Sequence, residues 1–102
     1  MYHVTELVFE WDKSKESSNR LKHGVTFEEA RGAFFDAFAQ VIPDPLHSKD
    51  EDRFILLGIS RSLRLLVVVH ALRNEGNTIR IISARKATTN ETVRYRRGRR
   101  DG

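Results

Sequence analysis

The chain has 102 residues, of which 39% are hydrophobic and 31% are charged, and it contains no cysteine. This composition is typical of one folded domain, 1–102, rather than of a disordered chain, and it excludes a disulfide framework and a thiolate metal site. The longest apolar run, Leu65 to Val69, is too short to span a bilayer, and no secretory signal is apparent. We therefore expect a cytoplasmic protein without a membrane partner.

The formal net charge of +4 is concentrated near the C-terminus. Residues 88–102 contain five arginines against Glu91 and Asp101, which gives +3 and leaves +1 for residues 1–87. A basic tail attracts nucleic acid through the release of counterions, and it also attracts acidic proteins. Charge alone does not choose between these two kinds of partner.

The N-terminal half is predicted to contain one strand and two helices. Residues 2–11 partly alternate between apolar and polar side chains, as a strand does. Asp12 is a suitable N-cap for a helix that ends at Gly24. Thr26 and Glu29 have the spacing of a capping box that opens a second helix. The apolar face of this helix would comprise Phe27, Ala30, Phe34, Ala37 and Phe38.

The C-terminal half is predicted to be a series of strands followed by a helix. A strand near residues 40–42 should end at Pro43, and three strands at hairpin spacing follow over residues 54–60, 65–72 and 78–85. A second capping box, Thr88 with Glu91, opens a basic helix or tail at about 88–102. The expected fold is α+β, with helices packed on a small antiparallel meander in the order β-α-α-β-β-β-β-α.

The run from Arg80 to Ala87 is a β-branched strand that ends in two adjacent cations, Arg85 and Lys86. These cations add nothing to strand stability, but they suit an anion such as the RNA backbone. Because an arginine fork can grip two phosphate oxygens, Arg53, Arg80 and Arg85 are candidates for stabilising charge on a reacting phosphate. The alternative is that each arginine pairs with an acidic side chain at the sheet edge.

A family resemblance that is described below implies cleavage of RNA. Without a metal ion, this reaction uses the ribose 2′-hydroxyl as nucleophile and needs groups that accept and donate protons. His70, at the end of the apolar run, could serve near neutral pH, or it could be a satisfied histidine at a strand end. Lys22 is a second candidate. It shares a helix face with Lys15 and Asn19, and this stripe could follow a phosphate backbone or simply be solvated.

Other side chains could hold RNA without taking part in the reaction. Trp11 and Tyr95 could stack on unpaired bases. Trp11 suits the core as well, because it ends a strand, whereas Tyr95 lies between two arginines and is predicted to be exposed. The cationic candidates are Lys15, Lys86, Arg96 and Arg97.

An acidic loop from Asp44 to Asp52 contains residue types that bind metals, but their spacing matches no metal motif. The sequence also lacks a glycine-rich phosphate loop, a serine or cysteine nucleophile motif and paired zinc ligands. We therefore predict that the protein uses neither a metal nor another cofactor.

Several segments together resemble the BrnT family, the toxin half of a bacterial type II toxin–antitoxin system. They are Phe9 to Asp12, Lys22 to Val25, Phe27 to Ala30, Glu51 to Arg53, Leu65 to His70 and Arg80 to Ala87. The resemblance spans residues 9–95 and implies a RelE-like ribonuclease fold with RNA as substrate. It also implies a cognate antitoxin with a ribbon-helix-helix domain, through which the pair would bind operator DNA.

The residues alone predict a basic α+β domain that binds RNA. Together with the resemblance, they predict a metal-independent endoribonuclease toxin that cleaves RNA by 2′-hydroxyl attack, inhibits bacterial growth and is neutralised by its antitoxin. The alternative is a non-catalytic RNA-binding or protein-interaction module that uses the same basic surface.

Overall fold

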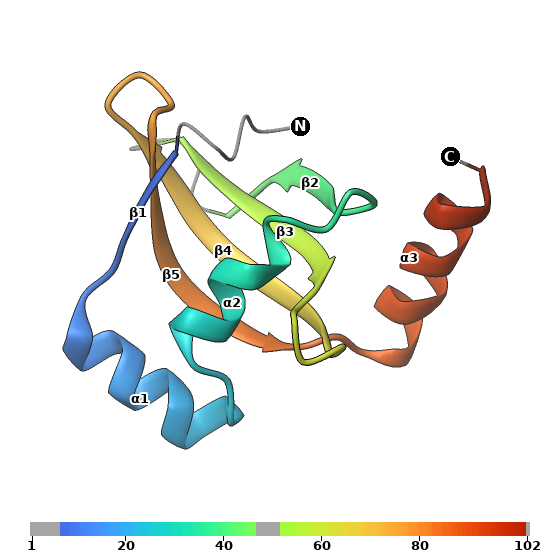
Figure 1. Ribbon diagram of the computed structural model, residues 1–102, viewed down its shortest axis with the longest axis horizontal. Helices are drawn as coiled ribbons and strands as arrows, with labels where there is room; N and C mark the ends of the chain where they lie inside the picture. The colour runs from blue at the N-terminus through green and yellow to red at the C-terminus, as the bar shows by residue number, and fades with distance from the viewer. Residues whose placement is uncertain (1–6, 47–51, 102) are drawn as a thin grey trace.

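The computed structural model describes residues 7–46 and 52–101. Helices lie on both sides of one sheet (Figure 1), and the predicted α+β class and element order are confirmed. In chain order the elements are β1 (Val8–Glu10), α1 (Lys13–His23), α2 (Phe27–Ala33), β2 (Gln40–Pro43), β3 (Arg53–Ile59), β4 (Leu65–Arg73), β5 (Thr78–Lys86) and α3 (Thr89–Asp101).

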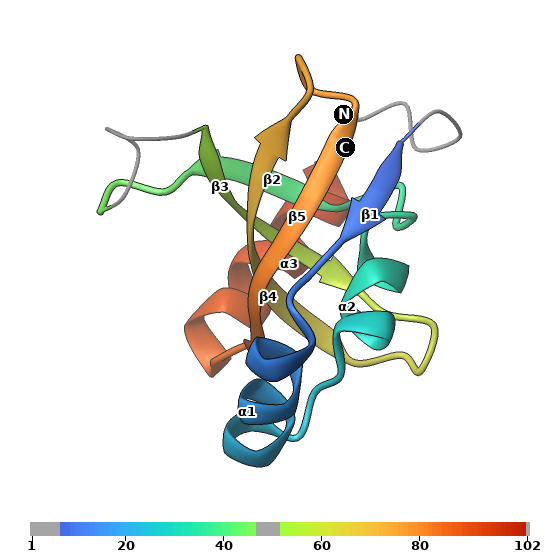
Figure 2. The ribbon, with the colours of Figure 1, turned by 90° about the vertical axis from the view of Figure 1, so that its left-hand side faces the viewer.

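The sheet has five strands in the order β1-β5-β4-β3-β2. Strands β2 to β5 form the predicted antiparallel meander. Strand β1 adds a parallel pair at the edge, with Val8 opposite Thr78 and Glu10 opposite Arg80. A parallel pair needs a long connection, which is available here because two helices and three strands lie between β1 and β5 in the chain. The sheet is strongly twisted when it is seen from the side (Figure 2).

The predicted caps of the first helix are present. The Oδ1 atom of Asp12 accepts hydrogen bonds from the backbone N–H groups of Ser14 (2.8 Å) and Lys15 (3.1 Å). At the other end Gly24 adopts the left-handed conformation, with φ of 69°, which glycine adopts without a steric penalty. These caps confine α1 to the predicted range.

The second helix begins as predicted but is shorter. Thr26 Oγ1 accepts a hydrogen bond from the backbone of Glu29, whereas the Glu29 carboxylate turns to Arg64 and Ser60 instead of completing the capping box. The helix ends at Ala33, and the following turns leave Ala37 and Phe38 exposed. Their predicted place on the buried face of α2 is therefore wrong.

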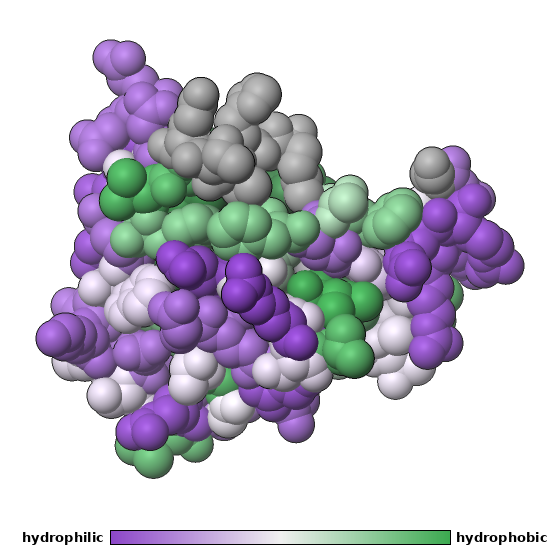
Figure 3. All heavy atoms as spheres, in the orientation of Figure 1, coloured by the Kyte–Doolittle hydropathy of each residue, from purple (hydrophilic) through white to green (hydrophobic). Residues whose placement is uncertain are grey.

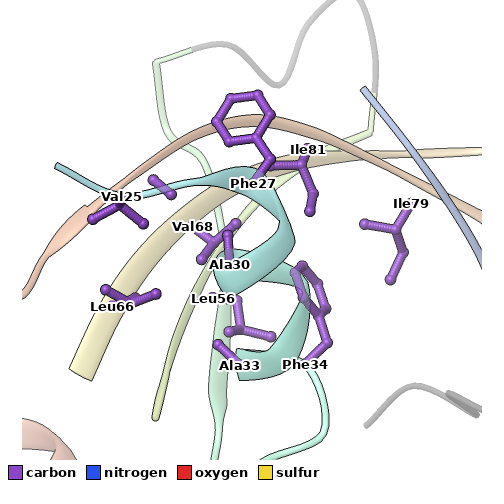
Figure 4. Packing of buried hydrophobic residues seen from close by; sticks show 11 residues of the cluster. Val25, Phe27, Ala30, Ala33, Phe34, Leu56, Leu66, Val68, Ile79 and Ile81 are labelled. Atoms are coloured by element: carbon purple, nitrogen blue, oxygen red, sulfur yellow. The ribbon is translucent and has the colours of Figure 1, made fainter. Parts of the chain in front are cut away.

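Two apolar clusters lie on opposite faces of the sheet. The larger cluster packs α2 against β3, β4 and β5 (Figure 4). It comprises Val25, Phe27, Ala30, Ala33, Phe34, Leu56, Leu66, Val68, Ile79, Ile81 and Ala84. The smaller cluster comprises Leu57, Val67 and Tyr95, and through it α3 packs on the other face. The smaller cluster lies at one end of its face of the sheet, and α3 covers only that end. Within the described residues, no helix covers the other end of this face.

Candidate functional site

Four strands place a row of side chains across the face on which α3 packs. Arg53 on β3 lies opposite Ala71 on β4, and Ala71 lies opposite Arg80 on β5. Arg80 in turn lies opposite Glu10 on β1. Directly paired residues of neighbouring strands point to the same face, so the row presents Arg53, Arg80 and Glu10 together.

Arg80 and Glu10 form an ion pair, with Nη1 and Oε2 3.0 Å apart. The two side chains keep 30% and 41% of their surface exposed, so a ligand could still reach them. Two strand spacings separate Arg53 from Arg80, which places their Cα atoms about 10 Å apart. The residue between them is the small Ala71. This spacing suits a phosphodiester held between two guanidinium groups.

Glu10 was not among the site residues predicted from the sequence. It lies in the segment Phe9 to Asp12 that carries the family resemblance, but its partner Arg80 is 70 positions away in the chain. The parallel register of β1 with β5 is what joins them, and no local sequence signal indicates that register.

Arg85 is held by an acidic neighbour. Its Nη1 and Nη2 atoms donate to the two carboxylate oxygens of Glu91 at 2.8 and 2.9 Å. Glu91 also accepts from the backbone of Thr88, while Thr88 Oγ1 accepts from the backbone of Glu91, which completes the predicted capping box. The hydrogen bond to Arg85 lowers the pKa of Glu91 to about 2 and raises the pKa of Arg85. Arg85 thus joins β5 to α3, which favours the alternative of an acidic partner, and its predicted contact with a substrate phosphate remains a prediction.

The position of His70 argues against its predicted role in proton transfer, which remains a prediction. The side chain is 0% exposed and lies edge-on to Phe34, with ring centroids 4.8 Å apart. Its Nδ1 atom lies 3.2 Å from the carbonyl oxygen of Val68, and burial lowers the pKa of the imidazole to about 4. Every second residue of a strand points to the same face, so His70 shares the α2 side of the sheet with Val68 and Leu66. It therefore points away from the row of arginines.

The predicted stripe on α1 is divided. Lys15 and Lys22 are exposed, but Asn19 between them is buried against β5. The two lysines line a hollow of about 290 Å³ beside β5, to which Ser14, Ser18 and His23 also contribute. Lys22 thus stands at the edge of the sheet, and its predicted part in proton transfer remains a prediction.

The two aromatic candidates are placed differently from each other. Tyr95 is 3% exposed, and its hydroxyl donates to Asp36 Oδ2 at 2.5 Å, so the predicted exposed stacking position is wrong. Burial, followed by the hydrogen bond to Asp36, raises the pKa of Tyr95 to about 12. Trp11 is half-buried and lies edge-on to Phe27, with ring centroids 6.2 Å apart, at the margin of the core. The cationic candidates Lys86, Arg96 and Arg97 are exposed.

The acidic loop lies only partly within the described residues. Asp44 is buried, and its Oδ1 accepts a hydrogen bond from the backbone of Leu46 at 3.0 Å. His47, Asp50 and Glu51 lie outside the described residues. Within residues 7–46 and 52–101, no group of three or more His, Asp or Glu side chains could hold a metal ion. No helix in this part of the chain is long and apolar enough to cross a membrane.

The model of one protein family, described as the ribonuclease toxin BrnT of a type II toxin–antitoxin system, matches residues 11–91. The chain belongs to the BrnT family. The 1.1 Å crystal structure of the Brucella abortus ribonuclease toxin BrnT has the same fold, with a TM-score of 0.62 and 24% identity. That match covers 81% of this chain and 99% of the Brucella chain. No curated protein matches the sequence.

The match to the family model shows which residues of this chain correspond to the BrnT family pattern. The matched range includes Arg53, Arg80 and Arg85, and it ends at Glu91 in the first turn of α3. The exposed arginines of the rest of α3 therefore lie beyond the matched range.

Proposed function

We propose that this chain is an endoribonuclease toxin that cleaves RNA without a metal ion and is neutralised by a cognate antitoxin. The observation that carries the proposal is the row formed by Arg53, Ala71, Arg80 and Glu10 on one face of the sheet. The row combines two cations with a carboxylate, on a chain that belongs to a ribonuclease toxin family. The proposal includes a cytoplasmic location and a ribbon-helix-helix antitoxin through which the pair binds operator DNA.

The reaction begins at the ribose 2′-hydroxyl next to the scissile phosphate. Its oxygen attacks phosphorus, and the proton passes to the Glu10 carboxylate, which the Arg80 guanidinium holds in place. The bond between phosphorus and the 5′-oxygen then breaks, which leaves a 2′,3′-cyclic phosphate on one product. The leaving 5′-oxygen takes a proton from a second donor, for which Lys22 remains the candidate.

The two arginines act on the charge of the phosphate. Negative charge builds up on the non-bridging oxygens as the 2′-oxygen attacks, and guanidinium groups at Arg53 and Arg80 stabilise it from two sides. Both arginines are carried by strands, so the sheet holds their separation without reorganisation during the reaction.

The direct test is incubation of purified, antitoxin-free protein with bulk RNA in excess EDTA. We expect cleavage products that end in a 2′,3′-cyclic phosphate, or its hydrolysed form, and a 5′-hydroxyl. RNA that stays intact in EDTA and is cleaved when Mg²⁺ is restored would contradict the mechanism. RNA that is bound but never cleaved would instead support the non-catalytic module.

A further inference from the structure

A second surface carries two exposed phenylalanines, each with an arginine over its ring. Phe35 and Phe38, in the turns that follow α2, are 44% and 42% exposed. The guanidinium carbon of Arg61 lies 5.9 Å from the ring centre of Phe35, and that of Arg99 lies 5.0 Å from the ring centre of Phe38. We call these four residues the Phe–Arg surface. They come from the segment after α2, the β3–β4 turn and α3, and together they line a hollow of about 290 Å³.

Asp36 fixes the segment that carries both rings. Its Oδ1 accepts from the backbone of Phe38 at 2.9 Å, and its Oδ2 accepts from the backbone of Ile59 at 2.8 Å and from the hydroxyl of Tyr95. The segment is thereby attached to both β3 and α3. In the part of the chain that the structure describes, three donors already form hydrogen bonds with the Asp36 carboxylate, which forms no ion pair with either arginine of the surface.

Among the described residues, neither arginine of the surface is held by an acidic side chain, in contrast to three arginines on the sheet and its turns. Arg64, Arg80 and Arg85 each pair with a glutamate. Arg61 and Arg99 have no ion pair within residues 7–46 and 52–101, and their contacts are with the aromatic rings. The surface therefore presents positive charge beside exposed aromatic carbon. In Figure 3, apolar atoms are exposed between the hydrophilic surfaces of the α2 and α3 regions.

We propose that the Phe–Arg surface binds single-stranded RNA, with bases stacked on Phe35 and Phe38 and phosphates held by Arg61 and Arg99. Aromatic rings combined with cations are the usual means of holding unpaired nucleotides, whatever their sequence. Large exposed apolar side chains in a cluster indicate a binding surface, and the two unpaired guanidinium groups select a polyanion. The inference rests on the proposed function only in identifying this RNA as part of the substrate strand.

The surface would hold the substrate away from the bond that is cleaved. Arg53 is the first residue of β3. Ile59 is the last residue of β3 and lines the hollow of the Phe–Arg surface, so the two positions are about 20 Å apart along the strand. RNA bound at both places would extend over several nucleotides. The toxin would then favour long unpaired segments without reading their sequence.

The test measures binding of a fluorescent 2′-O-methyl oligouridine, which cannot undergo 2′-hydroxyl attack, to the full chain. Phe38→Leu keeps an apolar side chain but removes the ring, and we expect binding about tenfold weaker. Phe38→Trp should bind at least as well as the wild type, and its added indole fluorescence should be quenched by RNA. Arg99→Gln should reduce the log–log salt slope by about 0.7. Arg20→Gln, which removes an exposed arginine on α1, is the matched control for charge.

Three results would overturn the inference. The first is wild-type protein that does not bind the oligonucleotide. The second is a Phe38→Leu variant that is folded by circular dichroism and binds RNA like the wild type. The third is a Phe38→Leu variant that no longer binds the antitoxin but binds RNA as before. The last result would make the surface a protein contact. If the wild type fails to cleave RNA but the Phe38 series behaves as expected, the nuclease proposal fails and the RNA surface stands. Cleavage without any effect of the Phe38 series gives the reverse conclusion.

Discussion

Asn19 on α1 pairs with the backbone of Ala84 on β5 much as a neighbouring strand would. Its Nδ2 donates to the Ala84 carbonyl oxygen at 2.8 Å, and its Oδ1 accepts from the Ala84 N–H at 3.0 Å. A further bond runs from Nδ2 to the carbonyl oxygen of Val25 at 3.0 Å. Strand β1 pairs with β5 only from Thr78 to Arg80, so Asn19 protects the edge where β1 no longer covers it. The same bonds fix α1, and with it Lys15 and Lys22, beside β5.

Replacing Asn19 by alanine should therefore destabilise the protein strongly. The change removes both partners of the Ala84 backbone at a buried position, and we expect a loss of about 2–4 kcal/mol in the free energy of unfolding. Urea denaturation followed by circular dichroism measures it. Ser18→Ala, at the exposed neighbouring position on α1, is the control and should stay close to wild type. A loss below about 0.5 kcal/mol for Asn19→Ala would show that the edge does not depend on this side chain.

Removing either charged member of the Arg80–Glu10 pair should reduce cleavage without unfolding the chain. Arg80→Ala should lower the rate constant at saturating RNA by about 10²–10³, the usual effect of losing one stabiliser of the developing charge. Glu10→Gln should lower it by about 10²–10⁴ if Glu10 accepts the 2′-hydroxyl proton. Single-turnover cleavage is the measurement, and Arg20→Ala on α1 is the control. Unchanged rates per folded molecule in both variants would mean that the pair is structural.

The sequence predicted those features that depend on neighbours in the chain. The caps at Asp12, Gly24 and Thr88 are local, and so are the turns between β3, β4 and β5, and all of them lie where the residue types indicate. These signals need no knowledge of packing, because each is satisfied within a few residues.

The features that the sequence did not predict depend on which face a side chain occupies. Tyr95 lies between two arginines in the chain, yet its side chain packs on Leu57 and Val67 of the sheet. His70 directly follows an apolar run in the sequence. It lies two residues after Val68 on the same strand and therefore points to the same buried face. The acidic partner of Arg80 depends on strand register, which lies beyond any local pattern.

The Arg85–Glu91 contact should appear in the dependence of stability on pH rather than in catalysis. The pKa of Glu91 is lowered from 4.5 to about 2 in the folded protein, so its contribution is complete above about pH 5 and is lost as the pH falls towards 2. Because Arg85 is 41% exposed, we expect this contribution to be only about 1–2 kcal/mol. Arg85→Ala should lower stability by this amount at neutral pH, and the difference from wild type should shrink between pH 5 and pH 2.

Thermal unfolding of wild type and Arg85→Ala across that pH range tests the assignment. Arg85→Lys, which keeps the charge but cannot form two parallel hydrogen bonds, should give an intermediate stability. The cleavage rate per folded molecule should change little in Arg85→Ala. A rate loss comparable to that of Arg80→Ala would return Arg85 to the active site.

His70 provides a second pH test, in a different range. Burial lowers the pKa of its imidazole from 6.5 to about 4, so the unfolded chain binds a proton at a pH where the folded protein does not. Acidification from about 6.5 to 4 should therefore weaken the wild type, because His70 contributes full stability only above the unfolded pKa. His70→Leu should remove this part of the pH dependence, while the loss associated with Glu91 at lower pH remains. It should also keep the cleavage rate per folded molecule, since His70 lies on the α2 side of the sheet. If His70→Leu folds but no longer cleaves RNA, His70 takes part in catalysis through a conformation in which it is not buried.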